Sequence, residues 1–493
     1  MLKMSLYPIF ALMSTIKPPS EEHVQARIRT ENPWWTGAGV DPIYREMRQR
    51  AFFGPFMRLV RAKVRRAVVL LGPRRVGKTV MLQQCVQQLI ESGVPPQKIC
   101  LLSVDQPVYS RMRLDDLFRL CRSALKDDDP AGYHVLFDEI QYLTDWERDL
   151  KVLVDTYPRT RFIVSGSATA ALKAKSQESG AGRFTEFLLP PLTFHEFLHL
   201  LDRQQLIVQV KRDWGGREVL FHDTIDIGTL NILFNQYITF GGYPEALFDQ
   251  LIQQDPGRFI RSDIVDKVLL RDLPSLYGIG DVQELNRFFS VVAYNTGQIF
   301  SYGSLGETSG VDANTLRKYL EYLEAAYLIR RLRRLDMSAK QYQREHGFKV
   351  YLTNPSLRTA LFGPLPEDDL AFSALAETAV YAQDLTMQEM VYYANWKEGR
   401  SEGEVDLVRL DARLKPDRLC EVKWSDRYVD KPGELKSLLS FALRNKVEWA
   451  VVTTRTRSMT RTVNGVELRY VPTALYVYHR GIRAIEAVEA TYR

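Results

Sequence analysis

One stretch constrains this chain more than any other. Residues 67–71 are apolar, a glycine follows them, and the pattern becomes helical after Thr79. The glycines, lysine and threonine in between match the spacing G-x-x-x-x-G-K-[ST] of a phosphate-binding loop. Such a loop wraps backbone N–H groups around phosphates at a helix N-terminus, where the helix dipole also favours anions. The predicted phosphate-binding residues are Gly72, Pro73, Arg74, Arg75, Val76, Gly77, Lys78, Thr79 and Val80.

Two side chains of this loop have expected chemical roles. Lys78 is expected to reach the β- and γ-phosphates of ATP, and the Thr79 hydroxyl is expected to bind Mg²⁺. The alternative is a chance match, but the strand before the loop and the helix after it argue against chance. ATP and Mg²⁺ are therefore the predicted cofactors.

A second apolar run, residues 134–137, ends in Asp138 and Glu139, which is the Walker B pattern. Asp138 is expected to hold Mg²⁺ directly or through water, and Glu139 is expected to orient the attacking water. Strands often end in carboxylates that simply face solvent. The position of this pair, one β–α unit after a phosphate loop, favours the catalytic interpretation.

Residues 161–167 are predicted to form a third core strand, with Ser165 and Ser167 at its C-terminal end. In a parallel sheet the carboxyl ends of the strands face the ligand crevice. One of these serines is therefore expected to sense the γ-phosphate or to position water; the alternative is an ordinary turn. An additional strand at 98–104, between the two motifs, points to the ATPase group that uses a catalytic glutamate.

Composition narrows the class of protein without deciding its function. A length of 493 residues suggests about three domains. The net charge of +6 permits a nucleic-acid partner but is too small for this length to argue for one. The four cysteines are scattered, which indicates free thiols in a reducing cytosol. Residues 1–13 are too short to span a bilayer, so we expect a cytoplasmic chain with no membrane partner.

Several short motifs together carry a family resemblance. They are Gly182–Phe184, Leu189–Phe197, Gly241–Ala246 and Arg271–Leu273. In these motifs the chain resembles the prokaryotic AAA-type ATPases that carry a DUF4143 C-terminal region. The resemblance implies an α/β fold with a five-stranded parallel P-loop sheet, a small helical lid, a winged-helix-like segment and a restriction-endonuclease-like α/β C-terminal domain.

The predicted domains follow from this resemblance and from the patterns along the chain. Residues 203–235 are polar and irregular and are predicted to be an insertion or linker. The predicted divisions are an N-terminal extension at 1–40, a P-loop ATPase core at 41–200, a helical lid and linker at 201–280, a winged-helix-like segment at 281–345 and a restriction-endonuclease-like domain at 346–493.

Arg183 is a candidate arginine finger. It follows a Gly/Ser/Ala-rich segment at 176–182, from which a guanidinium could reach a γ-phosphate in the same chain or in a neighbouring subunit. A guanidinium there would stabilise the transferring phosphoryl group. The alternative is a surface-loop arginine, and Arg271 is a second candidate for the same role.

Residues 302–320 have the pattern of a helix-turn-helix. Gly310 is expected to make the turn and Asp312 to cap the second helix, with Leu316, Leu320 and Leu323 buried. Paired arginines follow, as in the wing of a winged helix. This unit is expected either to contact DNA or to pack against protein. The exposed or basic residues concerned are Thr315, Arg317, Lys318, Arg330, Arg331, Arg333 and Arg334.

A second constellation of charged residues lies near the C-terminus. Alternation places Glu421 and Lys423 on one face of a strand, and Asp406 lies on the preceding strand of an expected hairpin. Together they match the PD-(D/E)xK nuclease pattern, and Glu377 lies on a helix where some members carry a further carboxylate. The carboxylates would bind Mg²⁺ and the lysine would assist the nucleophile. The alternative is an ion-paired strand face, and this fold often survives without catalytic activity.

The sequence thus predicts a Mg²⁺-dependent ATPase whose hydrolysis cycle drives a C-terminal half that is directed at DNA. Whether that half is also a nuclease is left open. One alternative is a nucleotide-switched binding protein with an inert terminal domain. A second is a nuclease that ATP only regulates. The expected partners are ATP and DNA, and a homo-oligomer is left open.

Overall fold

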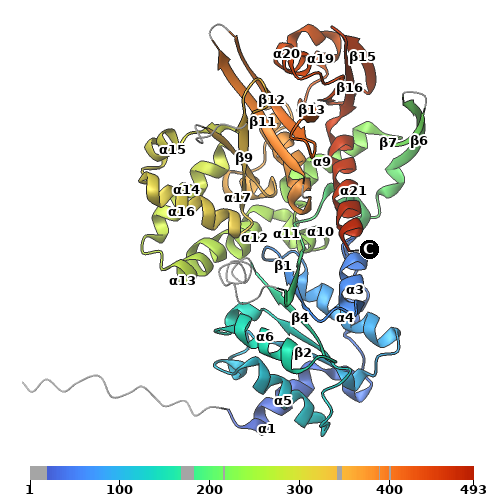
Figure 1. Cartoon of the computed structure of the whole chain (residues 1–493), viewed down its shortest axis with the longest axis vertical. Coiled ribbons are helices and arrows are strands. Elements are labelled where there is room, and N and C mark those ends of the chain that lie inside the picture. The colour runs from blue at the N-terminus through green and yellow to red at the C-terminus, as the bar shows by residue number, and fades with distance from the viewer. Residues whose placement is uncertain are drawn as a thin grey trace, which may run out of the picture.

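The computed structural model describes residues 19–167, 182–214, 217–340, 347–387, 389–398 and 401–492. Residues 1–13 and most of the segment ahead of Arg183 lie outside this description. Two α/β units are stacked along the long axis of the molecule, the P-loop unit below and the C-terminal unit above (Figure 1).

The lower unit is built on a five-stranded sheet that is parallel throughout, which confirms the predicted P-loop core. The strand order is β2-β3-β4-β1-β5, so β4 lies between the strands that carry the two nucleotide motifs. The strands are apolar runs because helices cover both faces of the sheet. The strands are β1 (Ala67–Leu71), β2 (Ile99–Ser103), β3 (His134–Asp138), β4 (Arg161–Gly166) and β5 (Phe184–Leu188), and the helices around them are α2 (Pro42–Arg45), α3 (Phe53–Arg61), α4 (Lys78–Glu91), α5 (Leu114–Leu125) and α6 (Trp146–Thr156).

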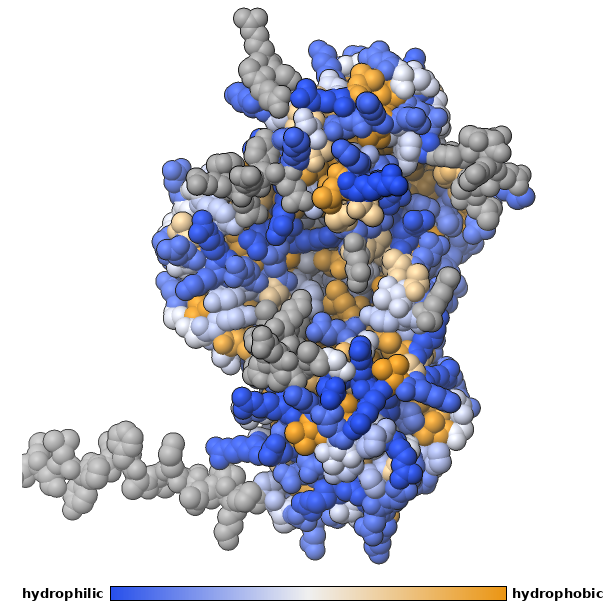
Figure 2. All heavy atoms as spheres, viewed as in Figure 1, coloured by the Kyte–Doolittle hydropathy of each residue, from blue (hydrophilic) through white to orange (hydrophobic). Residues whose placement is uncertain are grey.

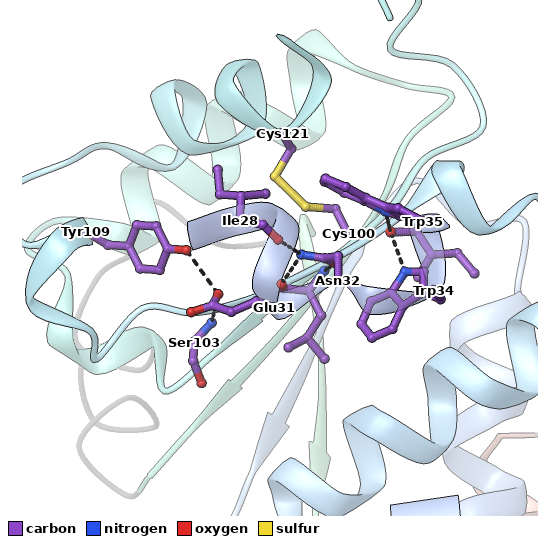
Figure 3. Close-up of a disulfide and its surroundings, with 11 residues drawn as sticks. Ile28, Glu31, Asn32, Trp34, Trp35, Cys100, Ser103, Tyr109 and Cys121 are labelled. Carbon is purple, nitrogen blue, oxygen red and sulfur yellow. Dashed lines mark hydrogen bonds between the residues drawn. A yellow bond between two sulfur atoms is a disulfide. The ribbon is translucent and has the colours of Figure 1, made fainter. Parts of the chain in front are cut away.

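The segment before residue 40 covers the edge of this sheet. Helix α1 (Glu21–Glu31) and the turn η1 (Pro33–Thr36) lie beside β2. The Asn32 amide donates to the Leu101 carbonyl at 3.0 Å and accepts from the Leu101 N–H at 2.7 Å, as a neighbouring strand would (Figure 3). The indoles of Trp34 and Trp35 both donate to the Ile99 carbonyl, at 3.0 and 2.7 Å. These side chains satisfy backbone groups that an edge strand otherwise leaves open to pairing with other chains.

Cys100 on β2 and Cys121 on α5 form a disulfide beside this segment (Figure 3). The prediction of free thiols was wrong for this pair, and Cys85 and Cys420 are free and buried. The two bonded cysteines are 21 residues apart in sequence. Only the packing of α5 beside β2 brings them together.

A helical region connects the two units. It includes a β-hairpin where an irregular linker was predicted, because the alternation that begins at Ile207 forms a strand. Its elements are α8 (Phe194–Leu200), β6 (Ile207–Trp214), β7 (Arg217–Thr224), α9 (Ile227–Phe240), α10 (Pro244–Phe248), α11 (Gln250–Gln254), α12 (Pro256–Ile260), the π-helical stretches η7 (Arg261–Val265) and η8 (Val268–Asp272), and α13 (Leu273–Tyr277).

The upper unit includes the predicted helix-turn-helix. Gly310 has a positive φ of 74° and Asp312 caps α16 by accepting from two backbone N–H groups. The three predicted leucines of α16 are buried. The elements are α14 (Val282–Tyr294), β8 (Ile299–Phe300), α15 (Tyr302–Ser309), α16 (Ala313–Ala325), β9 (Ile329–Leu335) and β10 (Phe348–Leu352).

Strands of the helix-turn-helix region belong to the same sheet as the C-terminal strands. The order in this nine-stranded sheet is β15-β16-β14-β13-β12-β11-β9-β10-β8. The boundary predicted at residue 345 therefore falls inside the β9–β10 hairpin. The remaining elements are α17 (Ser356–Phe362), α18 (Phe372–Ala382), η9 (Gln383–Thr386), β11 (Met390–Glu398), β12 (Ser401–Leu410), β13 (Pro416–Glu421), α19 (Arg427–Asp430), α20 (Lys436–Arg444), β14 (Trp449–Thr454), β15 (Met459–Val463), β16 (Val466–Pro472) and α21 (Thr473–Thr491).

The last helix, α21, returns from the upper sheet to the lower one (Figure 1). Beyond it, the Tyr492 hydroxyl donates to the Glu186 carbonyl on β5 at 2.9 Å, and its ring packs on Phe187. On the face shown in Figure 2, hydrophobic residues form separate patches between hydrophilic ones. No helix in the described part of the chain is long and apolar enough to cross a membrane.

Candidate nucleotide site and the C-terminal carboxylate cluster

The predicted phosphate loop joins β1 to α4 at the carboxyl edge of the lower sheet. Gly72 has to be a glycine because a Cβ there would overlap the Leu189 carbonyl. Gly77, with φ of 94°, adopts the left-handed conformation that glycine allows and leads directly into α4. The loop geometry thus requires glycine at both ends of the motif.

Lys78 lies folded back inside this loop. Its ammonium donates to the carbonyls of Gly72 at 3.1 Å and Pro73 at 2.8 Å, and the residue is only 5% exposed. Burial lowers the pKa of Lys78, while the nearby Glu139 and Asp138 carboxylates act in the opposite direction. A bound phosphate would supply the anionic partner that the loop carbonyls only partly replace.

Asp138, at the end of β3, binds side chains from α4 and β4. Its carboxylate accepts from the Thr79 hydroxyl at 2.7 Å and from the Ser165 hydroxyl. The placement of β4 between β1 and β3 puts Ser165 between the two nucleotide motifs. Burial, and then the neighbouring Glu139 charge, raise the pKa of Asp138. A bound cation would relieve both effects.

Glu139 follows Asp138 in a left-handed conformation, with φ of 59°, which non-glycine residues adopt rarely and often at functional sites. Its backbone N–H donates to the Ser165 hydroxyl at 3.2 Å. Gln141, which we did not predict, donates to the Glu139 carboxylate and accepts from the Ser167 N–H at 3.2 Å. Gln141 therefore orients the predicted catalytic carboxylate.

The two loop arginines bind the helical region through their side chains. Arg74 makes a bidentate ion pair with Asp272, with both distances 2.7 Å. Arg75 contacts Glu245 at 2.9 Å and Asp263 at 2.5 Å. Residues 263 and 272 are two and a half α-helical turns apart, and the wider i→i+5 turns of the π-helical stretches bring them toward one face. Both side chains of the pair therefore tie the phosphate loop to the helical region.

The C-terminal residues also meet, as the hairpin register required. Leu407 lies opposite Cys420, so Asp406 is beside Glu421. The Lys423 ammonium is 2.9 Å from Glu421 and 3.6 Å from Asp406. The sequence pattern therefore placed these three side chains correctly.

An unpredicted lysine occupies the centre of this cluster. The Lys349 ammonium on β10 lies 3.0 Å from Glu377, 2.6 Å from Glu404 and 3.6 Å from Asp406, and Lys349 is 2% exposed. These carboxylates raise the pKa of Lys349 even though burial opposes the shift. Lys349 therefore places a positive charge among three of the acids, Glu377, Glu404 and Asp406.

The metal prediction does not fit this cluster. Among the described residues, no group of three or more His, Cys, Asp and Glu side chains is placed to hold a metal ion. The expected ligands Glu377 and Asp406 instead bind lysine ammonium groups. Burial and the Asp406 charge raise the pKa of Glu421 to about 7, which further weakens it as an anionic ligand near neutral pH.

Comparisons with known proteins agree with the lower unit. A family model described as "AAA domain" matches residues 64–198. The chain carries an AAA-type P-loop domain. A second family model, a domain of unknown function (DUF8612), matches residues 231–368. The sequence resemblance implied a DUF4143 region there instead.

Similar proteins add little about function. An uncharacterized Haemophilus influenzae protein is 24% identical over 82% of this chain and 92% of its own length. An uncharacterized Mycobacterium tuberculosis protein is 28% identical over 62% of this chain and 58% of its own length. The solved structure of Aeropyrum pernix ORC1 in complex with DNA covers 64% of this chain and 92% of its own, at 11% identity and a TM-score of 0.31. That likeness is too weak to carry an argument.

The candidate finger Arg183 lies at the wrong edge of the AAA domain for its own nucleotide. Its carbonyl accepts from the N–H of Ala67, the first residue of β1, whereas the phosphate loop follows the last. The two positions are about 17 Å apart along the strand, and Arg183 pairs with Asp155 at 2.6 Å. A finger role within the same chain is therefore wrong. Arg271 lies at the correct edge, where its guanidinium stacks on Tyr142 just after the Walker B strand.

A buried ion pair that we did not predict supports the phosphate loop of the AAA domain. Arg50 binds Glu196 at 2.7 and 2.9 Å and also donates to the carbonyls of Val76 at 2.6 Å and Pro190 at 3.0 Å. Glu196 lies in the motif at 189–197 that carried the resemblance. No local pattern identifies Arg50, because its partners are distant in sequence.

Three of the four wing arginines are engaged inside the molecule. Arg331 pairs with Glu324 at 2.6 Å. Arg330 donates to the Asp384 carbonyl at 3.1 Å and Arg334 to the Asn395 carbonyl at 2.8 Å. Arg333, like Arg317 and Lys318 on α16, is exposed. The packing alternative therefore accounts for most of this arginine cluster.

Proposed function

We propose that the AAA domain hydrolyses ATP in a Mg²⁺-dependent reaction. The single observation that carries the proposal is the meeting of Thr79 and Ser165 on the Asp138 carboxylate, with Glu139 adjacent. A hydroxyl and a carboxylate are the oxygen ligands that Mg²⁺ prefers, so these residues fit the ion. When bound, Mg²⁺ would neutralise charge on the β- and γ-phosphates.

Each residue has a role in this proposal. Lys78 would exchange its loop carbonyls for phosphate oxygens, and the loop N–H groups would hold the triphosphate. Glu139, oriented by Gln141, would position water and accept its proton. Ser165 would relay the state of the γ-phosphate through Asp138.

ATP hydrolysis would also move the helical region that connects the two units. Arg74 and Arg75 belong to the phosphate loop but bind Asp272 and Asp263 on the π-helical stretches, so a rearrangement of the loop would move those stretches. Arg271, next to Asp272, would then be carried toward or away from the nucleotide. We assign the finger role to Arg271 on this basis.

For the C-terminal half we propose a restriction-endonuclease-like fold that does not cut nucleic acid. The strand pairing of Asp406 and Glu421 supports the fold, as does the resemblance to the DUF4143 proteins. The Lys349 ammonium, which fills the carboxylate cluster, supports the loss of activity. The element order α14–β8–α15–α16–β9–β10, with β10 between β8 and β9, likewise supports a winged-helix origin for residues 282–352. DNA remains the proposed partner of the chain.

Steady-state phosphate release tests the ATPase proposal. Wild type should turn over, Lys78→Ala should lose ATP binding, and Glu139→Gln should bind ATP but lose turnover by roughly 10²- to 10⁴-fold. Arg27→Gln, on the exposed face of α1, is the matched control and should retain both. Tight binding without any turnover in wild type would favour the nucleotide-switched binding protein instead.

A further inference from the structure

The edge of the AAA sheet opposite the nucleotide carries a basic groove. A cavity of about 320 Å³ opens there between the segment before β1, the segment before β3 and the segment before β4. We call this cavity and its lining the amino-edge groove. Its basic residues are Arg61, Lys63, Arg65, Arg66, Arg159 and Arg161.

The positive charge of this groove is not neutralised. Its lining contains no aspartate or glutamate, and none of its six basic residues takes part in an ion pair within the described part of the chain. The acid behind the groove, Asp127, is bound by Lys98 at 2.6 Å and by the Tyr133 hydroxyl. The groove is therefore a local concentration of positive charge.

Two of these arginines build the groove and four remain for a ligand. Arg161 donates to the carbonyls of Val64 and Arg66, both at 2.7 Å, and Arg65 donates to the Val154 carbonyl at 3.1 Å. These bonds fix residues 61–66 against the sheet. Four of the groove's basic side chains make no hydrogen bond within the described part of the chain: those of Arg61, Lys63, Arg66 and Arg159.

The basic surface continues along α6. A second cavity, of about 420 Å³, is lined by Arg148 and Lys151 and reaches Asp155. The Asp155 backbone carbonyl accepts a hydrogen bond from Arg65 of the first cavity, and the Asp155 carboxylate forms an ion pair with Arg183 at 2.6 Å. The two cavities therefore adjoin at Arg65 and Asp155, and we call their two linings together the basic track.

We propose that this track binds the phosphate backbone of DNA. Five of the six groove cations are arginines, whose planar guanidinium matches phosphate oxygens, and an extended track suits a polymer with regularly spaced phosphates. A concave groove fits a backbone better than it fits the flat surface of an anionic membrane. The track lies at the edge of the sheet remote from the phosphate loop, so DNA and ATP can be bound together.

This inference rests on the proposed function only in the choice of DNA as partner, since binding to the track requires no hydrolysis. Fluorescence anisotropy of a labelled duplex DNA should therefore be measured on the full chain without nucleotide, across a salt series. The variant Arg61→Ala/Lys63→Ala/Arg66→Ala removes three free groove cations. The matched control Arg317→Ala/Lys318→Ala/Arg333→Ala removes three exposed cations from the helix-turn-helix face.

The groove variant should bind DNA at least tenfold more weakly, and its plot of log affinity against log salt should be shallower by about 1 for each residue removed. The control should match wild type. ATP affinity should be unchanged in the groove variant, which shows that the domain is folded and separates this test from the ATPase proposal. Three results would overturn the inference: no DNA binding by wild type, loss of DNA binding in the control alone, or a groove variant that loses binding to anionic lipid vesicles and retains DNA.

Discussion

The buried pair between Arg50 and Glu196 offers the sharpest test of how the phosphate loop is held. Replacing Arg50 with methionine keeps the volume of the side-chain stem but leaves the Glu196 carboxylate buried, with an exposed fraction of 0% and no cation. It also removes the donor that binds the Val76 carbonyl inside the loop. We therefore expect both the stability of the AAA domain and its affinity for ATP to fall.

The magnitudes follow from the contacts. Breaking a buried ion pair by removing one partner costs about 3–5 kcal/mol, against a total domain stability of about 5–15 kcal/mol. In the double variant Arg50→Met/Glu196→Leu no charge is left buried. The backbone N–H groups of Ala51 and Thr193 then lose an acceptor, at about 1 kcal/mol each. The double variant should thus be more stable than Arg50→Met by about 1–3 kcal/mol.

Urea unfolding followed by tryptophan fluorescence measures the stabilities, and a fluorescent ATP analogue measures the affinities. Loss of the charged hydrogen bond to Val76 should weaken ATP binding about tenfold in both variants. Glu22→Gln, on the exposed first turn of α1, serves as a control for surface charge. If the effects of Arg50→Met and Glu196→Leu simply add within about 0.5 kcal/mol, the pair does not stabilise the loop as a unit and the reasoning fails.

Three further predictions address the other sites. Arg271→Ala should lower ATP turnover on the order of 10³-fold while Arg183→Ala stays near wild type; equal phosphate-release rates for the two variants would remove Arg271 from the site. In the nucleotide-free chain, Mn²⁺ should raise the melting temperature of Lys349→Met but not that of wild type. If Mn²⁺ raises the melting temperature of wild type and Asp406→Asn abolishes this effect, the predicted metal site is present after all. That second comparison holds even if Lys349→Met does not fold. Burial lowers the pKa of His479 from 6.5 to about 4, and the nearby His222 adds to the shift. The stability that neutral His479 contributes is therefore complete above pH 6.5 and is lost as the pH falls toward 4. A melting-temperature profile of His479→Gln that is as steep as that of wild type between pH 4 and 6.5 would contradict this.

Much of the fold was readable from local patterns. Apolar runs predicted β1, β3 and β4, and the helix-turn-helix pattern predicted Gly310 at the turn and Asp312 as the cap of α16. The reason is that backbone hydrogen bonding and side-chain alternation depend on near neighbours in sequence. The same logic placed Asp406 beside Glu421, because a short hairpin fixes the register of its strands.

The errors came from contacts between distant segments. The disulfide joins a strand to a helix, and the linker at 203–235 contains a hairpin whose alternation was overlooked. The finger role of Arg183 toward its own nucleotide was inferred from its place after a glycine-rich segment. Its true position depends on which edge of the sheet β5 begins at, and this is a property of topology.

By itself, the sequence determined the phosphate loop, the Walker B carboxylates and the pairing of the C-terminal acids, since each is set by spacing along one or two adjacent elements. Only the tertiary structure decided what surrounds them. Strand order brings Ser165 between the nucleotide motifs, places Lys349 among the C-terminal carboxylates, and collects six cations from separate segments at the amino edge. Charges act through space rather than along the chain, so the chemistry of these sites depends on neighbours that no local pattern can name.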